Sequence, residues 1–172
     1  MKKFKKLFLL FSISFWRQVY LLIASFLTGN VFAKTTLGRF GNNTDIGPTV
    51  RFGNYPQNIF IGNHCSLGVE NHIYAGPNSK IIIGNGTMIG PLVFMTTEPF
   101  SMTKENPDSA HSGHEGDIII GENVRIGAHS ILLPGIKIGD GASIGAGSVV
   151  TKDIPEKTIY AGNPAKLIKQ IS

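Results

Sequence analysis

The sequence contains one cysteine, few charged residues and no acidic residue in its first thirty positions. The single cysteine, Cys65, excludes an internal disulfide framework and is compatible with a reducing compartment. Only 16% of the 172 residues are charged and 42% are apolar, a composition too apolar for a disordered chain. The 21 glycines lack the strict every-third-residue period of collagen. We therefore expect one folded domain with one appendage.

The positive net charge comes from the amino terminus. Residues 1–30 contain five basic residues and no acidic one, whereas residues 31–172 contain eleven of each sign. A nucleic-acid-binding surface needs clustered cations to displace counterions from phosphates. The neutral body therefore argues against a nucleic-acid partner.

Residues 1–33 form a basic and apolar segment in which an apolar run, Leu7–Trp16, is separated by Arg17 from a second run, Val19–Leu27. A signal peptide is one interpretation. A spanning helix is another, and it would place Arg17 near the middle of the bilayer at a cost of about 2.5–3.5 kcal/mol. We favour a helix that lies on the membrane surface, with its lysines near anionic headgroups, or packs on a subunit or on the domain core. The expected location is the cytoplasm, either free or peripheral at the inner face of the cell membrane.

Aliphatic residues recur at every sixth position through most of residues 34–172. A period of six matches neither an α-helix nor a simple alternating strand. It fits a short flat facet with one aliphatic side chain pointing inward, followed by a corner, so that three facets make a triangular coil. The series is unbroken near the carboxyl end, at Ile120, Ile126, Leu132, Ile138, Ile144 and Val150.

The predicted coils stabilise one another because no single coil buries its own inward side chains. Coils stack at strand spacing, about 4.8 Å, and each buried aliphatic side chain contributes about 1.5–3 kcal/mol before conformational entropy is counted. Residues 118–153 supply two coils and residues 35–95 about three more. After Asp153 we expect the chain to leave the coils and to end in a short helix from about residue 164 to 171.

The hexads resemble the left-handed parallel β-helix of the hexapeptide-repeat acyltransferases. Residues 118–171 are similar to the carboxyl half of the sugar and polysaccharide O-acetyltransferases, a group that includes maltose and galactoside acetyltransferases. The resemblance implies an all-β fold, a homotrimer, and transfer of acetyl from acetyl-CoA to a sugar hydroxyl, here in surface-polysaccharide biosynthesis. It rests on ordered motifs: Leu133-Pro134-Gly135, Gly145-Ala146-Gly147-Ser148, Val150-Thr151-Lys152-Asp153 and Ala161-Gly162-Asn163-Pro164-Ala165-Lys166.

The hexad pattern is interrupted at residues 96–117, where we expect a protruding functional loop. Members of the resembled family carry a catalytic histidine just after the last upstream hexad, and Glu98 stands where that histidine is expected. Three hypotheses remain open. Glu98 is the general base; His114 or His111 folds back over the cleft and acts as the base while Glu98 orients it; or the site is degenerate and the protein is not a catalyst.

The resemblance also implies a coenzyme A site in the groove between neighbouring subunits. Small corner residues would admit the pantetheine arm, and lysines of the tail would meet the nucleotide phosphates. Arg125 departs from the family, whose members often have Trp there. The residues carried over for this site are Ala128, Ala146, Thr151, Lys152, Lys166 and Lys169.

Two other function classes compete with the acetyltransferase. A non-catalytic trimeric β-helix that acts as a scaffold or binding protein would explain the missing histidine at position 98. A metalloenzyme similar to the γ-type carbonic anhydrases would need three convergent imidazoles. The five histidines are irregularly spaced, so we expect no metal. Cys65 lies inside a hexad, where a small side chain packed near a corner is the favoured interpretation.

Overall fold

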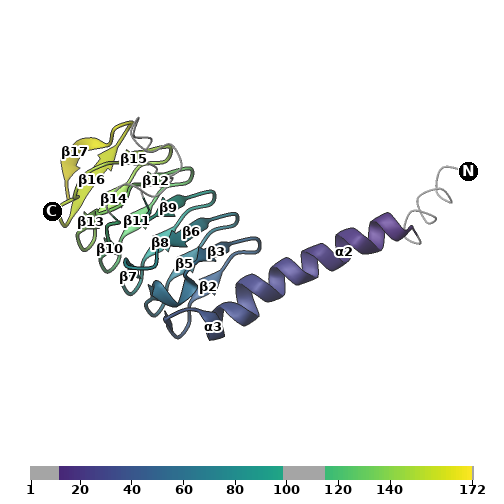
Figure 1. Cartoon of the computed structure of the whole chain (residues 1–172). Coiled ribbons are helices and arrows are strands. Elements are labelled where there is room, and N and C mark those ends of the chain that lie inside the picture. The colour runs from purple at the N-terminus through teal and green to yellow at the C-terminus, as the bar shows by residue number, and fades with distance from the viewer. Residues whose placement is uncertain (1–11, 99–114, 172) are drawn as a thin grey trace, which may run out of the picture.

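The computed structural model describes residues 12–98 and 115–171, and it is a solenoid of five stacked coils with a helix at its amino-terminal end (Figure 1). Each coil contributes one short strand to each of three parallel sheets, which we call A, B and C in chain order, and a corner follows each strand. This arrangement confirms the predicted parallel β-helix of hexapeptide repeats. The strands of the five coils are β1 (Arg39–Phe40), β2 (Asp45–Ile46) and β3 (Arg51–Asn54); β4 (Ile59–Ile61), β5 (Ser66–Leu67) and β6 (His72–Ala75); β7 (Ile81–Ile83), β8 (Met88–Ile89) and β9 (Phe94–Thr96); β10 (Ile118–Ile120), β11 (Arg125–Ile126) and β12 (Ile131–Leu132); β13 (Lys137–Ile138), β14 (Ser143–Ile144) and β15 (Val149–Val150).

Strands from successive coils pair in parallel to form the three faces of the prism. Sheet A has the order β1-β4-β7-β10-β13, and sheet C has the order β15-β12-β9-β6-β3. Sheet B has the order β16-β14-β11-β8-β5-β2, extended by β17 at its carboxyl-terminal edge. Equivalent hexad positions lie opposite each other, as where Ile61 pairs with Ile83 and Ile83 with Ile120. Residues that occupy the same place in different coils therefore form straight columns.

The core of the prism is built from the residues that the six-residue period singled out. Of the hexad positions, Phe52 is half-buried, and the others are buried aliphatic or methionine side chains. A second inward column stands at the corner before sheet B, where Thr44 and Thr87 donate from Oγ1 to the carbonyl oxygens of Gly62 and Gly121, at 2.8 and 2.9 Å. These bonds satisfy corner carbonyls and tie the first coil to the second and the third coil to the fourth.

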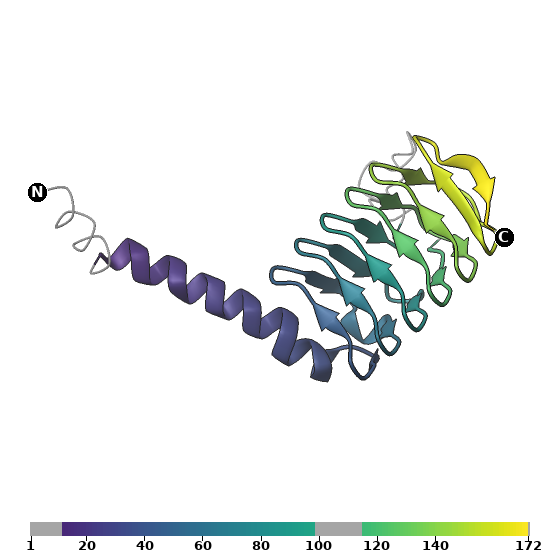
Figure 2. The same ribbon diagram turned by 180° about the vertical axis from the view of Figure 1, so that it is seen from behind.

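The amino-terminal helix projects from the first coil and away from the solenoid (Figures 1 and 2). Helix α2 (Ile13–Phe26) begins after Ser12, whose Oγ accepts a hydrogen bond from the Phe15 N–H at 3.1 Å, as an N-cap does. It continues through a π-helical turn, η1 (Leu27–Phe32), into α3 (Ala33–Thr36). No residue of α2 is buried, so the solenoid does not cover its apolar side chains. Among the described residues, no helix is both long and apolar enough to cross a bilayer.

The prediction of a short carboxyl-terminal helix is wrong. After Asp153 the chain forms β16 (Thr158–Ala161), which pairs with β14, and then β17 (Lys166–Gln170), which pairs antiparallel with β16. The physical reason is the open edge of the last coil, where the backbone N–H and C=O groups of β16 need partners. A helix would satisfy only its own backbone groups, whereas β17 pairs with the open strand and ends the sheet.

A second short segment, η2 (Pro56–Asn58), is a 3₁₀ turn between the first and second coils. It lies in the longer break between residues 52 and 61 that interrupts the sixfold spacing. Asn58 Nδ2 donates to the Gly76 carbonyl at 2.8 Å, which fixes this turn to the next coil. The insertion in the sequence is thus accommodated at a corner, while the strands that follow keep their register.

Neighbouring isoleucines on β7 test the stacking of inward side chains. Ile83 points inward and is 1% exposed, whereas Ile82 points outward and is 37% exposed. We expect Ile83→Ala to lower the free energy of unfolding by about 2–5 kcal/mol, because it leaves a cavity in the aliphatic column. Ile82→Ala, the matched control, removes the same atoms from an exposed face and should cost much less. Urea denaturation of both variants measures the difference; equal losses would contradict the inward stacking.

Candidate active site

The two ends of the interrupting loop are fixed to one corner of the solenoid. The chain leaves sheet C after β9 and returns at Glu115, before β10 of sheet A, so both ends lie at the C–A corner. Glu115 Oε2 accepts hydrogen bonds from the Asn78 N–H at 2.9 Å and from Ser79 Oγ at 2.7 Å. Thr97 Oγ1 lies 2.6 Å from Ser79 Oγ and accepts from the Gly76 N–H at 2.7 Å. The corner at residues 76–79 therefore holds both ends in place.

Glu98 is half-buried at this corner and is held by groups of two coils. Its Oε2 accepts from Asn54 Nδ2 at 2.5 Å, and its N–H donates to Thr96 Oγ1 at 3.2 Å. A Cβ added to Gly76 would lie 2.6 Å from Glu115 Oε2 and 2.9 Å from Glu98 Cγ. Both glutamate side chains therefore pack against Gly76, and a larger residue there would have to displace them. A carboxylate held in this way can accept a proton from a bound hydroxyl group.

The two histidines proposed for the same task, His111 and His114, lie outside the described residues. The structure does place Glu98, the third candidate, at the end of β9, on the edge of sheet C.

The small residues predicted for the coenzyme A groove form one column at the B–C corner. The Gly147 N–H donates to the Ala128 carbonyl at 2.8 Å, so Ala128 and Ala146 occupy equivalent places in consecutive coils. A Cβ on Gly145 would lie 2.7 Å from the Ala161 Cβ, and Ala161 pairs with Lys166. The column therefore leads to Lys166 at the carboxyl-terminal end of the solenoid. Lys166 is exposed, as a residue that binds a phosphate group must be.

The remaining predicted groove residues lie elsewhere. Thr151 and Lys152 follow β15 and are exposed at the C–A corner, on the same edge of sheet C as Glu98. Lys169 pairs with Ile159 on β16, at the end of sheet B. Within one chain, Glu98 and the Ala128–Ala146 column are thus on opposite edges of sheet C. Apart from Lys169, the described residues of the predicted site therefore lie along two opposite edges of sheet C.

Arg125 lies on the outer face of sheet B. Its Nη1 is 3.5 Å from Met88 Sδ, the side chain of the preceding coil at the equivalent position. A shallow groove of about 310 Å³ runs along this face, and Arg125 and Met88 line it together with Ser66. Arg125, which stands where members of the resembled family often have Trp, therefore places a cation in a surface groove.

Cys65 and the described histidines show no reactive constellation. The Cys65 side chain is buried, its Sγ lies 3.2 Å from the Gly84 carbonyl oxygen, and burial raises the pKa of the thiol. A thiol whose pKa is raised carries little thiolate at neutral pH, so Cys65 is a poor nucleophile. This confirms its interpretation as a small packed corner residue. Within residues 12–98 and 115–171, no group of three His, Cys, Asp or Glu side chains could hold a metal ion.

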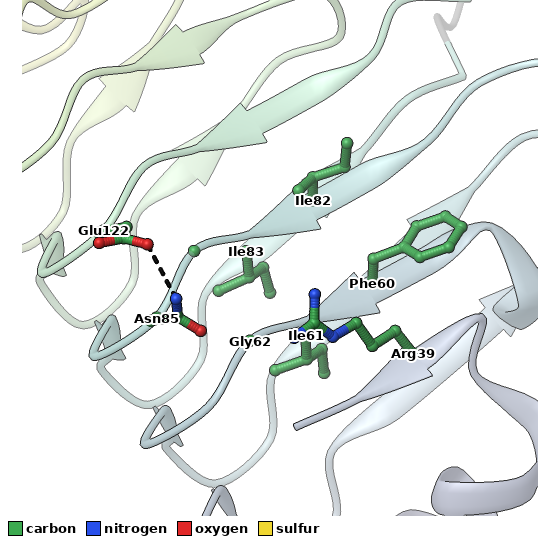
Figure 3. A pocket seen from close by; sticks show the side chains of 9 residues that line it. Arg39, Phe60, Ile61, Gly62, Ile82, Ile83, Asn85 and Glu122 are labelled. Atoms are coloured by element: carbon green, nitrogen blue, oxygen red, sulfur yellow. Dashed lines mark hydrogen bonds between the residues drawn. The ribbon is translucent and has the colours of Figure 1, made fainter. Parts of the chain in front are cut away.

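A pocket of about 200 Å³ opens on the outer face of sheet A (Figure 3). Phe60 and Ile82 form part of its wall, with Arg39 on one side and the Asn85–Glu122 pair, joined by a 2.8 Å hydrogen bond, on the other. The pocket includes none of the site residues that the sequence predicts. It belongs to a different face of the prism from the groove of Arg125.

The outer face of sheet C carries an aromatic cluster that the hexad pattern did not predict. His72, Tyr74 and Phe94 lie on the adjacent strands β6 and β9, with ring centroids 5.9 to 6.5 Å apart. One signal could have revealed it. His72 and Phe94 each stand immediately before an inward hexad residue, which is an outward position in both hexads. Aligning the hexads would therefore have placed the two rings side by side.

Comparisons with known proteins agree with the fold and with the corner motifs. The family model described as bacterial transferase hexapeptide (six repeats) matches residues 117–152. The galactoside O-acetyltransferase of Escherichia coli (strain K12) is 34% identical over 145 residues, which cover 81% of this chain and 66% of that protein. The chain spans less than two thirds of the length of the first curated relatives, 59% in the case of one from Staphylococcus aureus.

Solved structures give the same result. The maltose O-acetyltransferase of Clostridium difficile 630 superposes with a TM-score of 0.72 at 34% identity, over 81% of this chain and 73% of that one. A galactoside acetyltransferase in complex with coenzyme A superposes with a TM-score of 0.66 at 31% identity, over 81% and 68% of the two chains. Sequence identity of this size over most of both chains, together with the shared solenoid, establishes common ancestry. This chain belongs to the hexapeptide-repeat acetyltransferase family.

Proposed function

We propose that this protein transfers an acetyl group from acetyl-CoA to a hydroxyl group of a sugar. The hydroxyl oxygen attacks the thioester carbonyl carbon while a base removes its proton, and the tetrahedral intermediate collapses with loss of the CoA thiolate. The thiolate takes up a proton, so the products are an acetyl ester and free CoA. The proposal rests on the column of Ala128 and Ala146 that leads to Lys166, in a chain 31% identical to a galactoside acetyltransferase in complex with coenzyme A.

We place the coenzyme along the B–C corner. Small side chains at Ala128 and Ala146 leave room for the pantetheine arm beside the backbone, and Lys166 supplies a positive charge for a phosphate group. The base belongs to the C–A corner, at Glu98. Because these two corners lie on opposite edges of sheet C in one chain, the Glu98 corner of one copy must face the small-residue column of another. A homotrimer with three such contacts meets this requirement.

The base itself is one of three residues, Glu98, His111 and His114. Glu98 has a fixed place beside Asn54 at the edge of sheet C, where it either takes the proton itself or orients a histidine. A neutral imidazole suits the same step because its ordinary pKa lies close to neutrality. In both cases the hydroxyl group must approach the C–A corner.

Single substitutions identify the base. We expect one of Glu98→Gln, His111→Ala and His114→Ala to lower kcat/KM by about 10²–10⁴-fold, the usual contribution of a positioned base. Glu98→Gln keeps an oxygen that can accept a hydrogen bond from Asn54. A lower kcat/KM in this variant therefore reports the loss of proton transfer or of charge rather than a folding defect. Glu156→Gln, an exposed residue near the end of the solenoid, is the control. Full transfer rates in all three variants would refute the assignment.

The coenzyme groove is tested at Ala146. Ala146 is exposed, so a large side chain there fits without disturbing the core. We expect Ala146→Phe to raise the KM for acetyl-CoA at least tenfold by blocking the pantetheine arm, an effect of about 1.4 kcal/mol or more. Ala146→Ser keeps a small side chain and should bind acetyl-CoA as the natural protein does. Steady-state kinetics with varied acetyl-CoA distinguish the two, and an unchanged KM in the Phe variant would place the arm elsewhere.

We further propose that the amino-terminal segment holds the enzyme at an anionic membrane surface, near a lipid-linked or polysaccharide acceptor. Most large apolar side chains of α2 are exposed, among them Trp16, Leu22 and Ile23. Residues 1–30 carry five basic residues and no acidic one. Exposed apolar surface together with an excess of cations is the combination that binds anionic lipid headgroups.

Vesicle sedimentation tests this attachment. We expect the full chain to sediment with vesicles of phosphatidylcholine and phosphatidylglycerol, and more weakly with phosphatidylcholine alone. A chain without residues 1–30 should stay in the supernatant and still acetylate a soluble sugar. If the full chain does not sediment with either vesicle, the membrane proposal fails while the acetyltransferase proposal stands.

A further inference from the structure

Three aromatic side chains form a continuous surface on sheet C, which we call the aromatic platform (His72, Tyr74 and Phe94). The rings of Tyr74 and Phe94 are 5.9 Å apart at an interplanar angle of 52°. His72 stands edge-on to Tyr74 at 86°, with its Nδ1 3.4 Å from the Tyr74 hydroxyl oxygen. All three side chains are partly exposed. The platform therefore offers ring surface to a ligand and carries polar atoms beside it.

Backbone contacts fix the platform. A Cβ on Gly53 would clash with the edge of the Tyr74 ring, so this ring packs edge-on against the small residue of the preceding coil. His72 and Phe94 are direct neighbours in the parallel register of β6 and β9. Rings that are held by neighbouring strands lose little freedom when a ligand binds, which favours affinity.

The platform is continuous with the corner that carries Glu98. Tyr74 pairs with Thr96, and Thr96 Oγ1 accepts the Glu98 N–H at 3.2 Å. The Tyr74 carbonyl accepts from the Thr97 N–H at 3.1 Å. The strand that carries Phe94 therefore leads directly to Glu98, two residues beyond the partner of Tyr74. Farther along the same row, Ile131 and Val149 replace the aromatic residues, so the aromatic part of sheet C is confined to the coils next to Glu98.

We propose that the aromatic platform binds the sugar ring of the acceptor. A pyranose has a face of C–H groups that packs on aromatic rings and a rim of hydroxyl groups that needs hydrogen-bond partners. Tyr74 and Phe94 contact the C–H face, and one hydroxyl group points toward Glu98 and Asn54. This inference rests on the proposed sugar acetyltransferase function and makes Tyr74 and Phe94 determinants of acceptor specificity.

The chemistry of this face favours a sugar over a second copy of the chain. Polar groups stand beside the rings: Arg51 is the register neighbour of His72, and the Tyr74 hydroxyl group belongs to the platform itself. A contact between two chains would bury these polar groups and require partners for each of them. A polyhydroxylated ring supplies such partners at its own rim, where each buried hydrogen bond also discriminates between acceptors.

Kinetics with a soluble acceptor test the platform. Methyl β-galactoside and maltose are the acceptors, and the variants are Tyr74→Ala and Phe94→Ala in the full chain. We expect the KM for the better acceptor to rise about tenfold in each variant because ring contact is lost, with the KM for acetyl-CoA within about twofold of the natural value. Tyr74→Phe keeps the ring and should retain most of the acceptor affinity. Phe60→Ala, which removes an outward ring from sheet A, is the matched control and should leave the KM for the sugar unchanged.

Saturation-transfer NMR measures sugar binding without turnover and separates this inference from the proposed function. Transfer from aromatic protons to the sugar C–H protons in the natural protein, lost in Phe94→Ala and kept in Phe60→Ala, supports the platform even if no acetyl transfer is found. Acetyl transfer with an unchanged KM for the sugar in both alanine variants overturns the platform and leaves the proposed function intact. Dissociation of the oligomer by both alanine variants, seen by light scattering, also overturns it, because the face is then a contact between copies.

Discussion

The structure depends on the stacking of inward aliphatic side chains at strand spacing. Each hexad places one such side chain inside the prism, and parallel register sets it on its equivalent in the next coil, as Ile61, Ile83 and Ile120 are stacked. No coil can satisfy this requirement alone, so stability is shared between nearest neighbours along the solenoid. Any residue at a fixed place in the hexad therefore belongs to a column that runs along the molecule.

The functional features follow from these columns. Small residues at one hexad position become a strip of accessible backbone at the B–C corner, and the lysine that follows in β17 stands at its end. Outward residues form rows on the three flat faces of the prism, and the faces differ in composition. Sheet B carries Arg125 beside Met88, sheet A has the pocket lined by Arg39 and Phe60, and sheet C carries the aromatic rings. The loop can be inserted without disturbing the core because both of its ends are tied to the same corner by Thr97, Ser79 and Glu115.

Glu98 and Glu115 both lie beside Gly76 at the C–A corner. A partly buried carboxylate is costly unless hydrogen-bond donors face it. Here the donors are Asn54 for Glu98, and the Asn78 N–H and Ser79 for Glu115. Neutral donors thus face both carboxylates at the corner where the loop begins and ends. The same corner follows the strand pair that carries the aromatic rings of sheet C.

The sequence by itself determined the inward columns, the five coils, the place of the interruption and the small-residue corners. These features are local, because each facet is encoded by its own six residues and does not depend on distant segments of the chain. Only the tertiary structure decided that Tyr74 and Phe94 share a face, that Glu98 and Glu115 meet over Gly76, that Glu98 lies across sheet C from Ala128, and that residues 166–170 form a strand. Each of these four findings depends on the register between coils or on the unpaired edge of the last coil. The lengths of the segments between hexad runs specify neither the register nor the partner of that edge. The carboxyl-terminal segment has the composition of a helix as readily as of a strand, and the open edge of β16 decided between them.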